Sequence, residues 1–502
     1  MTGESVTNSV TATGVWGLDD VLGGGLPTNR VYLIEGNPGA GKTTLSLQFL
    51  LEGVARGERC LYVTLSETHD ELTSSAASHG WTLDKIRVLE LVAGEDDLRP
   101  ENQLAMFQPS ELELGTTIET ILKAVEETTP TRVVIDSLSE FRLLAQSSLR
   151  YRRQVLALKQ FFAGRNCTVL FLDDRTADGS DLQLQSIAHG VLMLDQLAPE
   201  YGGERRRLRV AKLRGRSYRG GYHDYVIEQG GIRVFPSLIA AEHVAMPATG
   251  LLGSGVAEMD EMADGGFEHG MSVLVIGPAG AGKSTLALQY AITAAKRGER
   301  SLILMFDERR ETLMSRAAGI NIDIRPHVDK GLITLQQVDP AQLSPGQLSH
   351  IIRSAAEGQD GSPPAKVVIV DSLNGYLNAM PEERYLSIQL HELLTYLGHK
   401  GVVTFLIVAQ HGLIGAMQTP VDATYIADAV VVLRYFEAFG EVKQAISIVK
   451  KRAGSHERAI REFRIDSQGL RIGEPLTSFQ GILTGTPKYL GDGKPLLESR
   501  DE

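Results

Sequence analysis

One glycine-rich pattern occurs twice in this chain of 502 residues, and the repeat limits the fold more than any other feature. The pattern is G-x-x-x-x-G-K-[ST], which reads G-N-P-G-A-G-K-T from Gly36 and G-P-A-G-A-G-K-S from Gly277. Its glycines let successive backbone N–H groups turn toward an anion, and its lysine reaches the terminal phosphates of a nucleotide. The two lysines, Lys42 and Lys283, are 241 positions apart. A glycine-rich turn can match this pattern once by chance, but a second match with the same flanks makes that explanation negligible.

Each loop stands between a predicted strand and a predicted helix. Apolar runs at 31–35 and 272–276 indicate buried strands, and 44–51 and 285–292 indicate helices whose N-termini face the phosphates. The predicted nucleotide-binding residues are Gly36, Asn37, Pro38, Gly39, Ala40, Gly41, Lys42, Thr43 and Thr44 in the first loop, and Gly277, Pro278, Ala279, Gly280, Ala281, Gly282, Lys283, Ser284 and Thr285 in the second.

The repeat extends beyond the loops. Strand-like runs at 59–65 and 300–306 are again 241 positions apart, and a further pair of apolar runs ends at Asp136 and Asp371. Because strands alternate with helices, we predict an α/β fold with two tandem P-loop domains, each a mainly parallel sheet flanked by helices. We expect domains at 13–240 and 241–487, a linker around 236–247, a disordered N-terminus at 1–12 and a short tail at 488–502.

Composition narrows the class of protein. The chain is 43% hydrophobic and 22% charged, and it lacks both an export signal and an apolar run of the ~20 residues that span a bilayer. Cys60 and Cys167 lie in apolar contexts without a C-x-x-C partner, which favours buried thiols in a reducing compartment. We therefore expect a cytoplasmic protein without a membrane partner. The net charge of −12 argues against broad electrostatic binding of nucleic acid.

Four oxygen-bearing residues are candidate ligands of Mg²⁺. Thr43 and Ser284 follow the loop lysines, and Asp136 and Asp371 end buried strands. P-loop enzymes hold Mg²⁺ with a loop hydroxyl and a strand-end aspartate, so ATP with Mg²⁺ is the expected ligand. An alternative is that each aspartate only caps a helix.

Three carboxylates are candidates for the catalytic base. Glu67 and Glu308 follow the second strand of each half, where a carboxylate can align a water for attack on the γ-phosphate. Asp307 adds a carboxylate where the first half has Ser66, so the two sites should differ chemically. Exposed loop acids remain the alternative.

With these residues in view, the chain resembles the KaiC family of circadian-clock ATPases, which belong to the RecA-like superfamily and have two fused ATPase domains. The resemblance runs from about Gly14 to Pro487 and is carried by the two loops and by L-Y-V-T-L-S-E-T, L-R-V-A-K-L-R-G and K-K-R-A-G-S-H-E-R-A-I-R-E-F. It implies a two-tiered homohexamer with ATP between neighbouring subunits. It also implies that Lys212 and Arg214, and likewise Lys450 and Arg452, reach the γ-phosphate held by the next subunit. A solvated basic edge is the alternative reading of these four cations.

The resemblance further implies that the C-terminal domain phosphorylates itself. The family's two acceptor hydroxyls align with Thr424 and Tyr425, although the usual pair is Ser-Thr. Thr and Tyr are also common strand residues, so a purely structural role for the pair stays open. Ser66 replaces a glutamate that is usual in the N-terminal site of clock members. Only fifteen residues follow Pro487, fewer than in the tail that binds the activating clock partner, so dependence on that activator is not expected.

The leading hypothesis is an ATP-hydrolysing, autophosphorylating, hexameric signalling or timing protein, with a KaiB-like protein or a histidine kinase as candidate partner. One rival is a DNA-dependent ATPase of the RecA/RadA type, which would use the cluster of basic residues between 205 and 219 to bind DNA. Another is a nucleotide-gated scaffold without kinase activity. Little aromatic interleaving accompanies the cluster beyond Tyr218, so we interpret it as an interface and do not expect nucleic acid as a partner. Its members are Arg205, Arg206, Arg207, Arg209, Lys212, Arg214, Arg216 and Arg219.

Overall fold

The chain divides into two compact units, residues 1–237 and 238–502, in a computed structural model. The structure describes residues 9–91, 110–145, 147–175, 182–198, 202–244, 250–339, 341–378, 386–410, 424–484 and 487–490. The first unit ends before the expected boundary at 240, because Ala240 packs in a core of the second unit and its N–H donates to Glu392 Oε2 at 2.8 Å.

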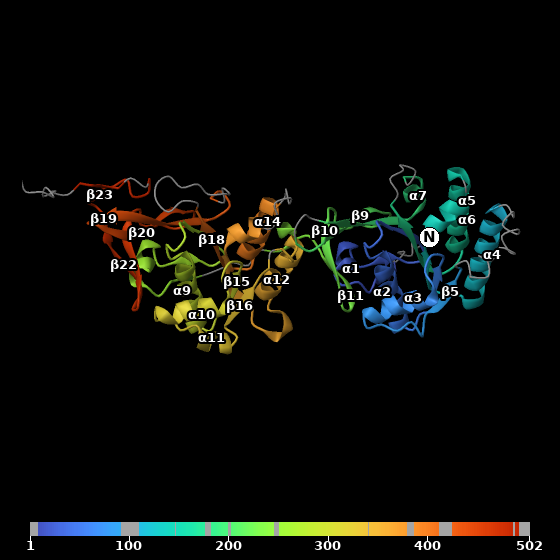
Figure 1. Cartoon of the computed structure of the whole chain (residues 1–502), viewed down its shortest axis with the longest axis horizontal. Coiled ribbons are helices and arrows are strands. Elements are labelled where there is room, and N and C mark those ends of the chain that lie inside the picture. The colour runs from blue at the N-terminus through green and yellow to red at the C-terminus, as the bar shows by residue number, and fades with distance from the viewer. Residues whose placement is uncertain are drawn as a thin grey trace, which may run out of the picture. The chain divides into compact units, whose positions relative to one another are not determined.

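The first unit is built on a nine-stranded sheet (Figure 1). Six strands are parallel, and three antiparallel strands extend the sheet beyond β8. In spatial order the strands are β11 (Gly231–Phe235), β10 (His223–Glu228), β9 (Arg205–Leu213), β8 (Gly190–Leu197), β3 (Val31–Gly36), β7 (Thr168–Asp174), β6 (Arg132–Asp136), β4 (Cys60–Thr64) and β5 (Arg87–Glu90).

Side chains of β3 alternate between two helical layers, as the two-residue period of a strand requires. Tyr32 and Ile34 pack with α1, α2 and α3, whereas Val31 and Leu33 pack with α4 to α7. Because both faces are covered, the central parallel strands are largely apolar. The helices are α1 (Leu18–Val21), α2 (Lys42–Ala55), α3 (His69–Ser78), α4 (Ser110–Thr128), α5 (Leu138–Ala145), α6 (Ser148–Ala163) and α7 (Leu182–Ile187).

The second unit repeats this plan. Its sheet has the order β16 (Ile333–Gln337), β15 (Arg300–Met305), β17 (Ala365–Asp371), β18 (Val403–Ala409), β14 (Ser272–Gly277), β19 (Ala429–Ala438), β20 (Glu441–Lys451), β21 (Arg461–Asp466) and β22 (Gly469–Pro475). The strands from β16 to β19 are parallel, and β20 to β22 extend the sheet in antiparallel fashion. The predicted fold of two mainly parallel sheets flanked by helices is confirmed.

Two helical layers also enclose the second sheet. Val273 and Val275 of β14 pack with α8 to α10, and Leu274 and Ile276 pack with α12 to α14. The helices are α8 (Ala257–Met262), α9 (Lys283–Lys296), α10 (Arg310–Gly319), α11 (Arg325–Asp329), α12 (Pro345–Glu357), α13 (Leu373–Asn378) and α14 (Leu386–His399), with 3₁₀ turns at Ala240–Glu242 and Gln359–Gly361.

Short strands correct one expectation about the termini. Val10 and Thr11 were expected in a disordered segment, but they form β1 (Val10–Thr11) and pair with β2 (Leu26–Pro27). The second unit has a similar pair, β12 (Leu251–Leu252) with β13 (Phe267–Glu268). Near the C-terminus, β23 (Phe479–Gln480) pairs with β24 (Lys488–Tyr489). Residues 1–8 and 491–502, for which disorder and a short tail were expected, lie outside the described residues.

The two thiols are buried and free, as expected. Burial raises the pKa of Cys60 and of Cys167 to about 11, so both stay protonated at neutral pH. In the described part of the chain, no helix is both long and apolar enough to cross a membrane.

Candidate functional site

Each glycine-rich loop joins a buried strand to a 14-residue helix, β3 to α2 and β14 to α9. The last loop glycine before each helix is left-handed, with φ of 91° at Gly41 and 93° at Gly282. A Cβ on Gly41 would lie 2.7 Å from Ile227 Cδ1, and one on Gly282 would lie 2.5 Å from Ile465 Cδ1. No side chain caps α2 or α9, so the N–H groups of their first turns can receive an anion.

Lys42 is buried at the centre of the first loop. Its Nζ atom donates to the carbonyls of Gly36 and Asn37 at 2.9 and 3.2 Å, and it lies 2.7 Å from Asp174 Oδ1. Asp174 ends β7, directly beside Gly36 of β3. The loop lysine is therefore held by an acid of the neighbouring strand.

Lys283 has different surroundings in the second loop. Its Nζ atom donates to the Pro278 carbonyl at 2.7 Å, and burial lowers the pKa of Lys283 while the charge of Asp371 opposes that shift. Ala409 pairs with Gly277 in the second sheet, just as Asp174 pairs with Gly36 in the first. The neighbouring strand therefore offers no carboxylate to Lys283.

The candidate magnesium ligands lie together in both units. Thr43 Oγ1 donates to Asp136 Oδ2 at 3.1 Å, and the Tyr62 hydroxyl donates to the same oxygen at 2.6 Å. A hydrogen bond from Ser284 likewise lowers the pKa of Asp371, but burial dominates and raises the pKa of both aspartates. A carboxylate next to a hydroxyl is an all-oxygen donor set that fits Mg²⁺, and the charge of such an ion would favour the ionised aspartates.

Glu67 lies near Asp136 at the carboxyl edge of the first sheet. Thr64 Oγ1 donates to the Glu67 carbonyl at 2.7 Å and accepts from the Glu67 N–H at 3.0 Å, which fixes the residue at the end of β4. Burial, and then the charges of Asp136 and Glu71, raise the pKa of Glu67. A raised pKa makes a carboxylate a better proton acceptor near neutral pH.

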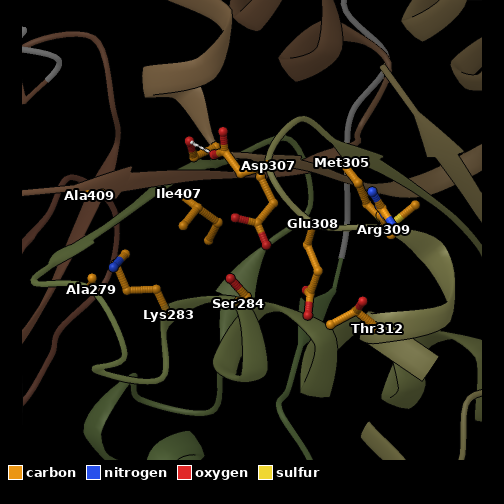
Figure 2. Close-up of a pocket in the computed structure, with 12 residues that line it drawn as sticks. Ala279, Lys283, Ser284, Met305, Asp307, Glu308, Arg309, Thr312, Ile407 and Ala409 are labelled. Atoms are coloured by element: carbon orange, nitrogen blue, oxygen red, sulfur yellow. Dashed lines mark hydrogen bonds between the residues drawn. The ribbon is translucent and has the colours of Figure 1, made fainter. Parts of the chain in front are cut away.

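A pocket of about 610 Å³ opens at the carboxyl edge of the second sheet (Figure 2). Six predicted site residues line this one pocket: Ala279, Lys283, Ser284, Asp307, Glu308 and Asp371. Asp307 Oδ2 accepts from Ser372 Oγ at 2.6 Å. Glu308 is held by Arg316 of α10, which donates to Glu308 Oε1 from Nε at 3.1 Å and to Oε2 from Nη2 at 2.9 Å.

The first predicted pair of trans-acting cations lies away from its own loop. Lys212 Nζ donates to the carbonyls of Gln185 and Ala188 at 2.6 and 2.8 Å, and Arg214 Nη2 donates to the Ser186 carbonyl at 3.1 Å. Lys212 lies beside Val191, which pairs with Leu33. Since Leu33 precedes Gly36 by three residues of strand, roughly 10 Å separates Lys212 from the loop edge along the sheet.

The second pair of cations has the same placement. Lys450 lies beside Val430, which pairs with Leu274 near the start of β14, three residues before Gly277. Both predicted pairs are therefore at the edge opposite the loop of their own unit. Lys212 and Lys450 are half-buried, whereas Arg214 and Arg452 are exposed.

The candidate acceptors Thr424 and Tyr425 lie in the turn before β19. Lys450 Nζ donates to the Thr424 carbonyl at 2.7 Å, and Arg452 Nη2 donates to the Tyr425 carbonyl at 2.8 Å. The Tyr425 residue is 60% exposed. Because β19 starts beside Val273, this turn is at the edge opposite its own nucleotide loop.

Several arginines of the basic cluster have partners within the first unit, which reduces the charge available to a polyanion. Tyr222, an aromatic that the sequence analysis missed, lies under two of them. The contacts are Arg206 with Glu204 at 2.5 Å, Arg216 with the Gly23 carbonyl, Arg219 Nη1 with the Ser237 carbonyl at 2.9 Å, and Arg207 and Arg209 over the Tyr222 ring at 5.2 and 5.7 Å from its centroid.

Sequence reasoning also missed Tyr62, Asp174 and Arg316 at the two sites. Asp174 and Arg316 differ between the two halves, but so do many other positions, and only the fold brings these two to the sites. No motif marks Tyr62, whose role depends on the β4–β6 register.

Comparison with known proteins accounts for the duplicated site. The model of the family described as "ATPase: KaiC" matches residues 11–239 and 252–477. The chain belongs to the KaiC family. Membership of this ATPase family implies that the protein binds and hydrolyses ATP. The two matched KaiC segments correspond to the two units of the structure, each with one glycine-rich loop.

Curated KaiC proteins align along nearly the whole chain. The circadian clock protein KaiC3 of Synechocystis sp. is 29% identical over 485 residues, which cover 95% of this chain and 94% of the relative. The circadian clock oscillator protein KaiC of Acaryochloris marina is 28% identical over 502 residues, covering 97% and 92%. That of Synechococcus elongatus is 28% identical over 488 residues, covering 95% and 91%.

Proposed function

We propose that this KaiC-family ATPase also phosphorylates itself on Thr424 or Tyr425, and that it does so as a homohexamer with ATP between neighbouring subunits. It would signal through its phosphorylation or nucleotide state, with a KaiB-like protein or a histidine kinase as candidate partner. The similarity of the chain to circadian clock proteins supports this role.

The two reactions differ only in the group that attacks the γ-phosphorus. In hydrolysis, a water oxygen attacks, its proton passes to Glu67 or Glu308, and the bond to the β–γ bridging oxygen breaks to release ADP and phosphate. In self-phosphorylation, the Thr424 or Tyr425 hydroxyl attacks, and the carboxylate of Asp307 or Glu308 of the subunit that holds the nucleotide takes its proton. Mg²⁺, held through Thr43 and Asp136 or through Ser284 and Asp371, would neutralise phosphate charge.

One arrangement carries the proposal. Lys450 and Arg452 hold the backbone of Thr424 and Tyr425, and all four residues lie at the edge opposite the loop of their unit. A cation pair and an acceptor at that edge are too far from the nucleotide of their own unit to act on it. In a ring, they would together face the nucleotide of the neighbouring subunit. The same edge would then deliver both the attacking hydroxyl and the charge that stabilises the transition state.

Incubation with γ-labelled ATP, followed by peptide mapping, tests the kinase step. We expect label on Thr424 or Tyr425, its loss in Thr424→Ala/Tyr425→Phe, and its loss in Lys283→Ala, which disables the second loop. The double acceptor variant should still release phosphate. Absence of label from both residues in the unaltered protein would remove the kinase step and leave the ATPase.

Two further measurements separate the rivals. Light scattering with and without ATP should detect a hexamer that needs nucleotide. A sharp, salt-sensitive rise of ATP turnover with single-stranded DNA would instead favour a DNA-dependent ATPase. Unchanged phosphate release in Glu67→Gln/Glu308→Gln would favour a nucleotide-gated scaffold and refute the assignment of the bases.

A further inference from the structure

Arg316 links three elements of the second unit. It extends from α10, holds both carboxylate oxygens of Glu308 at 3.1 and 2.9 Å, and donates from Nη1 to Thr285 Oγ1 at 2.8 Å. Thr285 follows Ser284 in the first turn of α9. A two-point contact between guanidinium and carboxylate is stronger and more directional than a single ion pair. Arg316 therefore fixes the orientation of the candidate base relative to the loop.

The first unit provides a natural comparison. Helices α3 and α10 correspond residue for residue at an offset of 241, as do Glu67 with Glu308 and Thr44 with Thr285. Position 75, which corresponds to Arg316, is Ser75, too short for such a contact. The two halves thus share the carboxylate and the threonine and differ in the group between them.

We propose that Arg316 is a positioning residue that restrains Glu308, so that the second site transfers a proton from water less readily than it would with the serine of the first site. The reason is competition for the carboxylate. To accept a proton, a Glu308 oxygen must weaken a charged hydrogen bond to Arg316. Among the residues that the structure describes in the first unit, no cation holds Glu67 in this way. The proposal rests on the proposed role of Glu308 as base.

Other charged groups surround this carboxylate. Asp371 of β17 is close enough for its pKa to be lowered by Arg316 and Lys283 and raised by Glu308, although burial dominates and raises it overall. The hydrogen bonds to Glu308 raise the pKa of Arg316, so the guanidinium stays charged at every accessible pH. Lys283, Asp307 and Arg309 line the same pocket, and Arg316 hydrogen-bonds to the Glu308 carboxylate itself. Removal of Arg316 should therefore change proton transfer and not only packing.

The full chain with Glu67→Gln isolates the second site for measurement. In that background, we expect Arg316→Ser to raise phosphate release by roughly tenfold, well within the ~10²–10⁴-fold that a general base contributes. The gain should appear in kcat, with the KM for ATP unchanged, because Arg316 acts on the candidate base. Arg316→Lys, which keeps one charged contact, should lie between the two.

The reciprocal change, Ser75→Arg in a Glu308→Gln background, should slow phosphate release at the first site. This second variant tests the proposal even if Arg316→Ser does not fold. Thermal melting and ATP affinity report whether each variant is intact. An intact Arg316→Ser protein with an unchanged or lower rate of phosphate release overturns the restraint. Unchanged release in Glu67→Gln/Glu308→Gln would instead refute the base assignment itself.

Discussion

The amino nitrogen of Lys42 lies 2.7 Å from Oδ1 of Asp174, whereas the position equivalent to Asp174 in the second unit is Ala409. The first loop lysine thus has a carboxylate partner where the γ-phosphate of ATP would compete for the same charge. The two nucleotide sites therefore differ electrostatically, although their loops share one sequence motif.

Asp174→Ala should tighten ATP binding at the first site. The gain should be roughly fivefold, since a partly exposed ion pair is worth about 1 kcal/mol. Titration of ATP into the full chain with Lys283→Ala would measure the first site alone. The reciprocal Ala409→Asp, measured with Lys42→Ala, should weaken the second site. If Asp174 instead helps to hold Mg²⁺, then Asp174→Ala would weaken binding only when Mg²⁺ is present.

Two inactive variants should restore activity to each other. Lys283→Ala removes the loop lysine of the second site, and Lys450→Ala removes the cation at the opposite edge. If a site takes one residue from each subunit, random 1:1 mixing should regenerate about one quarter of the second sites. Phosphate release in a Glu67→Gln background measures this recovery, and unmixed variants are the control. No recovery from subunits that exchange and assemble would contradict sites shared between subunits.

Asp136→Asn should stabilise the nucleotide-free first unit at neutral pH. Burial raises the pKa of Asp136 above its ordinary value of 3.8, so the folded state binds more protons than the unfolded state between the two values. Stability therefore falls as the pH rises from 3.8 through the raised pKa of the folded state, and asparagine avoids this penalty. The asparagine oxygen can still accept from Thr43 and Tyr62. We expect a rise in melting temperature of roughly 2–4 °C, as for about 1 kcal/mol in a domain of this size.

The gain from Asp136→Asn should vanish when the pH falls below the window, and stabilisation by ATP with Mg²⁺ should be lost. Asp371→Asn is the matched change in the second unit and should act in the same direction, because burial also raises the pKa of Asp371. A lower melting temperature at pH 7 without nucleotide would mean that the hydrogen bonds of the carboxylate outweigh its burial.

Local sequence accounts for most of the fold. The strands before the loops are continuous apolar runs because both sheet faces are covered, and Gly41 and Gly282 mark backbone that only glycine adopts without strain. The 241-residue offset predicted the correspondence of β4 with β15 and of the carboxylates that follow them. These features depend on neighbours in sequence, so a single chain reveals them.

What the sequence analysis missed depends on contacts across the fold. Asp174 meets Lys42 only through the β3–β7 register, and Arg316 meets Glu308 only because α10 packs beside the end of β15. The early end of the first unit has a similar cause, since Ala240 is held by a core of the second unit that local pattern does not identify.

In each unit the nucleotide loop and the paired cations occupy opposite edges of one sheet. If those cations complete a neighbour's site, every contact must join unlike faces, as in a head-to-tail assembly. A two-fold dimer would bring like faces together, so the cations of one subunit would not meet the nucleotide loop of the other. An open arc of subunits would always leave two nucleotide sites incomplete, one for each unit, so closure of the ring would itself complete the last two catalytic sites.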